Sequence, residues 1–170
     1  SDPDQIKLSE PIATIIFTIA GLIIFNLYPN LVGFFFNTDG EWTFVPLLSD
    51  AFFTYLPWIN LLGVLEIGFN LYQLRQKVWS TSTRVCNLIL EVGTLLLAGA
   101  MLNGPSLIDL SAEKLAGTPL TGLADVLTKV MSFVPGLVLL IIIIVSAIEV
   151  AQTAYRLMKN RHTSPYPVVK

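Results

Sequence analysis

The feature that most constrains the fold is a long apolar run over residues 134–158, VPGLVLLIIIIVSAIEVAQTAYRLM. A helix needs about 20 apolar residues to cross a hydrocarbon core of ~30 Å, and this run has that length. It contains one acidic residue, Glu149, and basic residues begin near its end at Arg156. The run therefore predicts a transmembrane helix that carries a carboxyl group inside the membrane.

Composition extends this prediction to the whole chain. Of the 170 residues, 54% are hydrophobic and 13% are charged, whereas a soluble domain carries about 25% charged residues. Polar residues and turn signals divide the apolar sequence into four spans, predicted at about residues 11–28, 58–78, 84–102 and 134–158. We expect an all-α membrane protein whose single four-span domain covers residues 1–162, followed by a flexible tail at 163–170.

Two long connections lie between these spans. In the first, a turn cluster at residues 37–40 separates two aromatic and β-branched runs, which predicts a short β-hairpin at the membrane surface. The stretch DAFFTYL then predicts a short helix that stops at Pro57. In the second connection, residues 120–133 have helical periodicity with polar residues on one side, which is typical of an interfacial amphipathic helix.

Basic residues predict the orientation in the membrane. Eight of the ten Lys and Arg residues lie at the chain ends or at the turn between the second and third spans, and only Lys114 and Lys129 lie in the long connections. Positively charged segments stay in the cytoplasm. We therefore expect both termini on the cytoplasmic side, in the cytoplasmic membrane of a bacterium, with the long connections and their interfacial segments outside.

The second and fourth spans share a pattern that indicates duplication. Glu66, Tyr72 and Leu74 have the same spacing as Glu149, Tyr155 and Leu157. An aspartate and a proline precede each set. We interpret this pattern as two helical hairpins in parallel duplication, an arrangement that membrane proteins often use; the alternative is chance similarity between apolar helices.

Three carboxyl groups are predicted at a similar depth in the membrane. At ~1.5 Å per helical residue, Glu66, Glu91 and Glu149 all lie roughly 10–14 Å from the basic edge of their spans. Three amide side chains form a second polar layer nearer that edge: Asn70, Asn87 and Gln152. A carboxyl group inside lipid costs at least ~2.5–3.5 kcal/mol, so we expect these side chains to face the protein interior and to find partners.

This polar cluster has two interpretations. Protonated glutamates could hydrogen-bond to amide and hydroxyl side chains on neighbouring helices and so fix which helix faces pack together. Alternatively, the three carboxyl groups could bind a proton or a cation, as a relay or in a polar cavity that opens to the cytoplasm. The sequence leaves both interpretations open.

Other kinds of site find no support in the sequence. No histidine lies in a span, Cys86 is the only cysteine, and the chain has no Cys/His cluster. A P-loop, a G-x-G-x-x-G, a G-x-S-x-G and a Ser/His/Asp set are also missing. Basic residues are scattered at helix ends. We therefore expect no catalytic residue, no metal, no cofactor and no nucleic-acid partner.

Two segments resemble a bacterial membrane family. These are DPDQIKLSEPIATIIFTIAGLIIFNLYP at the start and DGEWTFVPLLSDAFFTYLPWINLL further along the chain. They are similar to the membrane half of proteins with an N-terminal cytoplasmic helical domain of the HAAS type, also described as permease-prefix-like. The resemblance implies a signalling or regulatory role without an established catalytic site. Because this sequence starts at Ser1 without that domain, we expect a processed chain or a fragment.

Two functions follow as expectations. The first is a non-enzymatic integral membrane module that anchors or couples a signalling or regulatory domain, or that docks on a larger membrane complex. Its partners would be the lipid bilayer, other membrane proteins or a cytoplasmic domain N-terminal to residue 1. The second is a small proton-coupled or cation transporter that uses the intramembrane glutamates. A polar cavity reaching the glutamates would favour the second function.

Overall fold

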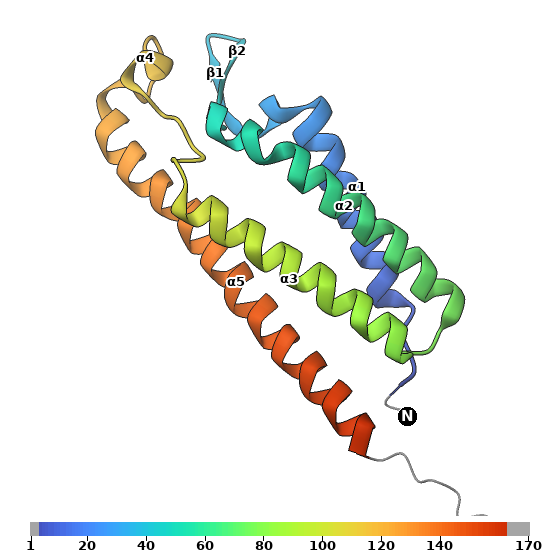
Figure 1. Cartoon of the computed structure of the whole chain (residues 1–170). Helices are drawn as coiled ribbons and strands as arrows, with labels where there is room; N and C mark the ends of the chain where they lie inside the picture. The colour runs from blue at the N-terminus through green and yellow to red at the C-terminus, as the bar shows by residue number, and fades with distance from the viewer. Residues whose placement is uncertain (1–3, 163–170) are drawn as a thin grey trace, which may run out of the picture.

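A computed structural model of the chain describes residues 4–162, so the predicted flexible tail at 163–170 lies outside the described part. Figure 1 shows an elongated bundle of helices with a small hairpin at one end. Within residues 4–162, four helices are long and apolar enough to cross a membrane: α1 (Ser9–Leu27), α2 (Asp50–Gln76), α3 (Thr81–Asn103) and α5 (Ala124–His162). The predicted all-α membrane fold with four spans is confirmed.

The helices pack mainly with their neighbours in the chain. The most extensive contacts join α1 to α2 and α3 to α5, and α2 and α3 also pack together. At most 17% of the most apolar window of each span is buried inside the protein, which suits helices whose outer faces meet lipid. The structure does not test the duplication proposed for the two hairpins, which stays a prediction.

Two helices are longer than the sequence predicts. α2 begins at Asp50 and continues through Pro57, and α5 begins at Ala124 and continues through Pro135. The predicted helix stop at Pro57 is therefore wrong, and residues 124–133 belong to the fourth span helix instead of a separate interfacial helix. A proline removes one backbone N–H, but a complete break within lipid would leave many more backbone groups without partners. Continuing the helix is the smaller cost.

The hairpin end of the bundle, which we name for its two strands, closes one end of the helices. β1 (Gly33–Thr38) and β2 (Glu41–Pro46) pair antiparallel, with Thr38 opposite Glu41, so the predicted hairpin is confirmed. Asp39 and Gly40 between them both have positive φ, as a two-residue type I′ turn requires. Short helical pieces complete this end: η1 (Pro29–Leu31), α4 (Ala112–Leu115) and η2 (Thr121–Leu123).

Two apolar clusters fill the interior toward the hairpin end. In the outer cluster, Val45 and Leu47 of the hairpin segment pack on Leu110, Leu115 and Ala124. The inner cluster joins α2, α3 and α5 through five buried side chains: Phe52, Ala98, Met101, Leu107 and Leu139. The two connections are tied together because the Ser49 hydroxyl donates to the carbonyl of Ser106 at 2.6 Å. The interior is thus apolar at this end.

The opposite end, which we call the turn end, contains the tight α2–α3 turn. Lys77 ends α2 in the left-handed conformation, and Ser80 begins α3 with a capping box to Thr83. The segment before α1 lies against this turn: Ile6 N–H donates to the Lys77 carbonyl at 3.0 Å, and Trp79 N–H donates to the Asp4 carbonyl at 2.8 Å. The turn end therefore holds the start of α1, the end of α2 and the start of α3 as one unit.

Candidate functional site

The three predicted glutamates lie on three different helices. Glu66 lies near the middle of α2 and is half-buried. Asn70, one turn later and buried, donates from Nδ2 to the Glu66 carbonyl oxygen at 2.8 Å and lies 3.4 Å from its Oε1. Gln73 continues this face toward the turn end; it is only 4% exposed, and its Nε2 has no hydrogen-bond partner among residues 4–162. One face of α2 thus carries a ladder of polar groups through the apolar interior.

Glu91 and Glu149 bring α3 and α5 together. The carboxyl group of Glu91 lies near enough to the carboxyl group of Glu149 and to the hydroxyl group of Ser146 for these side chains to interact. Ser146 is buried and lies one turn before Glu149 on α5. Glu66 is near enough to both carboxyl groups to interact with them electrostatically. The structure therefore places the three carboxyl groups in one cluster, in which Glu91 and Glu149 are neighbours.

A polar cavity of about 260 Å³ reaches this cluster from the turn end. Its wall is built from α1, the α2–α3 turn, α3 and α5 by eight residues: Glu10, Trp79, Arg84, Asn87, Glu149, Gln152, Thr153 and Arg156. Glu149 is therefore shared between the cavity and the carboxyl cluster. A small polar molecule or water in this cavity can reach the carboxyl group of Glu149.

Arg84 is the most firmly held charged residue of the cavity wall. Its side chain is only 7% exposed and forms an ion pair with Asp4. Its guanidinium carbon also lies 5.8 Å from the centroid of the Trp79 ring, within the range of a cation–π contact. The segment before α1, the α2–α3 turn and α3 thus meet at one arginine that lines the cavity.

All six predicted site residues belong to this region, but they do not form one layer. Asn87 and Gln152 line the cavity beside Glu149, whereas Asn70 pairs with Glu66 on α2. Sequence reasoning missed Ser146 and the charged rim. Ser146 lies three residues before Glu149 and so on the same helix face, a spacing that could have identified it. The contact of Glu10 with a cavity bounded by α5 depends on tertiary packing and has no signal in the sequence.

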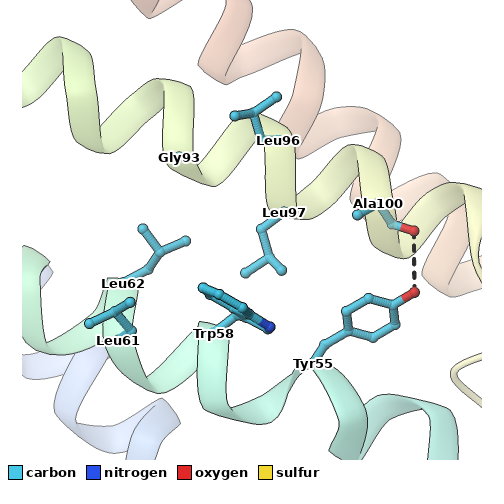
Figure 2. A pocket seen from close by; sticks show the side chains of 8 residues that line it. All are labelled: Tyr55, Trp58, Leu61, Leu62, Gly93, Leu96, Leu97 and Ala100. Atoms are coloured by element: carbon cyan, nitrogen blue, oxygen red, sulfur yellow. Dashed lines mark hydrogen bonds between the residues drawn. The ribbon is translucent and has the colours of Figure 1, made fainter.

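A second cavity, of about 450 Å³, is apolar and lies between α2 and α3 (Figure 2). Its wall has aromatic and aliphatic residues from α2 and small or aliphatic residues from α3: Tyr55, Trp58, Leu61, Leu62, Gly93, Leu96, Leu97 and Ala100. The Tyr55 hydroxyl donates to the Ala100 carbonyl at 3.3 Å. Trp58 and Leu96 are 61% and 69% exposed, so this cavity opens on the outer surface that we assign to lipid.

The site geometry offers proton chemistry more readily than metal binding. Within residues 4–162, no three His, Cys, Asp or Glu side chains lie close enough together to hold a metal ion. Two neighbouring carboxyl groups such as Glu91 and Glu149, in contrast, can share one proton. Comparison with protein-family models, curated proteins and solved structures found no significant match. The function is therefore argued from the site alone.

Proposed function

We propose that this protein is a non-enzymatic membrane module that binds a proton at the Glu91–Glu149 pair, reached from the cytoplasm through the polar cavity. The observation that carries the proposal is the position of Glu149, which belongs to the cavity wall and also lies beside Glu91. Two ionised carboxylates in contact repel each other, whereas a pair that holds one proton is joined by a hydrogen bond. Proton uptake would therefore change the interaction between α3 and α5.

The orientation is part of this proposal. The excess of Lys and Arg at the turn end favours the cytoplasmic side for that end, by the positive-inside rule. The cavity would then sample cytoplasmic pH. Toward the hairpin end, the apolar clusters around Phe52 and Val45 separate the carboxyl groups from the outside. This separation supports reversible binding from one side as the basic activity.

The signalling or regulatory role of the module also has structural support. The segment before α1 is bound to the α2–α3 turn through Asp4, and Asp4 is paired with Arg84 in the cavity wall. A domain or partner attached to this segment would be connected to the cavity through Asp4 and its ion pair with Arg84. We therefore propose that proton binding by the Glu91–Glu149 pair is coupled to a regulatory partner at the turn end.

Infrared difference spectroscopy on the protein in nanodiscs tests the proposal. A pH titration should show a carbonyl band of a protonated carboxyl group that disappears at high pH. Glu149→Gln and Glu91→Gln should each abolish this titrating band, because each removes one half of the pair. Glu113→Gln, an exposed residue of α4, is the matched control and should leave the band unchanged. A titrating band that persists in both Glu149→Gln and Glu91→Gln would overturn the proposal.

Proton-coupled transport is the second candidate. The observation that favours it is the same opening of the cavity onto a carboxyl group inside the span. Transport additionally needs a second state in which the apolar clusters at the hairpin end part. Liposomes with a pH gradient and an internal pH-sensitive dye would distinguish the two. Glu149-dependent proton flux supports transport, whereas a titrating band without flux supports the binding module.

A further inference from the structure

The charges of the polar cavity have a feature that proton binding does not use. Its wall carries two carboxyl groups, Glu10 and Glu149, and two guanidinium groups, Arg84 and Arg156. Within the described part of the chain, Arg84 has its ion pair with Asp4, but Glu10, Glu149 and Arg156 form no ion pair. The cavity thus offers a ligand two carboxyl groups and the guanidinium group of Arg156, beside an Arg84 that Asp4 already holds.

The charges are separated along the axis of α5. Glu149 and Arg156 are seven residues apart, which is roughly 10 Å at ~1.5 Å per residue. Helical side chains lean toward the N-terminus of their helix, so the guanidinium group of Arg156 leans toward Glu149 and shortens this gap. Glu149 therefore lies farther from the turn end than Arg156, whereas Glu10, in the first turn of α1, lies near the rim with Arg84.

The polar residues between these charges suit the middle of a small molecule. Asn87, Gln152 and Thr153 present amide and hydroxyl groups to the cavity, and the structure gives none of these three side chains a hydrogen bond within residues 4–162. Trp79 adds an aromatic face beside Arg84. A purely cationic ligand would meet two arginines, and a purely anionic ligand would meet two glutamates. A molecule carrying both charges can satisfy both pairs.

We propose that the polar cavity binds a small zwitterion, with its ammonium group at Glu149 and its carboxylate or phosphate group at Arg156 and Arg84. The volume of about 260 Å³ fits a compact molecule whose two charges are separated by a few bonds. This chemistry occurs in free amino acids and in the phosphoethanolamine headgroup of lipids. The inference rests on the proposed access of Glu149 to the cytoplasm, and it names the molecule that would share the site with the proton.

Tryptophan fluorescence gives a direct binding measurement. Trp79 is in the cavity, whereas Trp42 and Trp58 are strongly exposed, so Trp42→Phe and Trp58→Phe leave one reporter at low structural cost. The probe is 4-aminobutanoate, and butylamine and butanoate are matched molecules that each lack one charge. We expect 4-aminobutanoate to bind at least about tenfold more tightly than either, since each lost charge removes a charge-assisted hydrogen bond.

Variants connect binding to the cavity. Arg156→Gln and Glu149→Gln should each weaken 4-aminobutanoate binding by about tenfold. Arg75→Gln, at the exposed end of α2 outside the cavity, is the control and should change it less than about twofold. Butylamine or butanoate binding as tightly as 4-aminobutanoate would overturn the zwitterion. So would the absence of binding by all three probes, or equal binding by the cavity variants and the parent protein.

Nanodisc composition separates the two sources of the zwitterion. If the natural ligand is a lipid headgroup, 4-aminobutanoate will bind in phosphatidylcholine nanodiscs and be displaced in phosphatidylethanolamine nanodiscs. If it is a free molecule, binding will be equal in both. The infrared band of the Glu91–Glu149 pair is an independent readout. A titrating band together with no probe binding would refute the zwitterion site and leave the proton site standing.

Discussion

Two cavities of this protein, one apolar and one polar, differ in almost every respect except that both touch α3. The apolar cavity is larger, at about 450 Å³ against 260 Å³, and opens toward lipid between α2 and α3. The polar cavity lies at the turn end and carries charged groups of both signs. Size alone would select the first as the binding site. The difference teaches that, inside a membrane, the cost of retaining polar groups is a better indication of function than volume.

The free-energy cost of keeping each cavity differs because one is apolar and faces lipid, whereas the other contains charged groups. Lipid chains can fill an apolar cavity on the outer face without any specific contact, since they are as apolar as leucine. Carboxyl and guanidinium groups in a span are costly unless they are paired or meet water, and such groups commonly mark functional sites. Placing a charged residue in the apolar cavity and an apolar residue in the polar cavity should therefore change the free energy of unfolding by different amounts.

The largest effect is expected when a charge enters the apolar cavity. Leu62→Glu would place a carboxyl group near the middle of α2, facing Gly93, in a cavity wall that has no charged side chain and whose Tyr55 hydroxyl already donates to Ala100. We expect a loss of about 3 kcal/mol in the free energy of unfolding. Unfolding of the protein in mixed micelles by increasing SDS measures it. Leu62→Met is the control, with a loss below about 1.5 kcal/mol, and equal stability of both variants would contradict the comparison.

A smaller loss is expected when the fixed cation of the polar cavity is removed. Arg84→Gln breaks the ion pair with Asp4 and the contact with Trp79. Because the Asp4 side chain is 48% exposed, solvent screens part of the pair, and we expect a loss of about 2 kcal/mol. The same SDS titration measures it. A double-mutant cycle with Asp4→Asn isolates the pair, and a coupling energy of zero would show that the contact contributes no stability.

The reverse change, an apolar residue in place of a carboxyl group of the polar cavity, should lower the free energy of unfolding only slightly. Glu149→Leu removes a carboxyl group that is exposed to the polar cavity and leaves Glu91 with Ser146. Interhelical hydrogen bonds in membranes contribute on average ~0.6 kcal/mol, so we expect a loss of that order. The comparison is between Leu62→Glu and Glu149→Leu under identical conditions. A loss from Glu149→Leu as large as that from Leu62→Glu would mean that the carboxyl pair is mainly structural.

The smallest effect is expected for Glu66→Gln. Glutamine keeps the size of the side chain and can still accept a hydrogen bond from Asn70, whose main contact is with the backbone of residue 66. We expect thermal stability in detergent to change by less than about 0.5 kcal/mol. Glu66→Leu is the control that removes the acceptor. A strongly destabilised Glu66→Gln protein would indicate an ionised carboxylate paired with a cation.

Hydrophobic pattern and turn chemistry predicted most of the fold. The four spans and the hairpin at residues 33–46 follow from apolar length and from a turn cluster whose residues tolerate positive φ. The predictions at the two prolines were wrong. A proline locally favours the end of a helix, but breaking the helix in lipid costs more than keeping the proline inside it. That cost depends on the depth of Pro57 and Pro135 in the membrane, which the local sequence does not encode.

The candidate site also has a part that the sequence predicts and a part that depends on tertiary packing. Spacing to the basic edge placed Glu66, Glu91 and Glu149 near one depth, and the structure brings these three carboxyl groups together. The cavity itself could not be predicted, because its wall combines the first turn of α1 with the C-terminal third of α5. The ion pair between Asp4 and Arg84 joins residues 80 positions apart, and no periodicity relates them.

The length of α5 has a mechanical consequence. At ~1.5 Å per residue, its 39 residues extend roughly 58 Å, about twice the thickness of a hydrocarbon core of ~30 Å. One rod therefore joins the wall of the polar cavity to the apolar cluster beneath the hairpin, where Ala124 is buried. A tilt of this rod caused by occupancy near Glu149 would move its far end on the other side of the bilayer. Such a helix can transmit a conformational change across the membrane without transporting any molecule or ion.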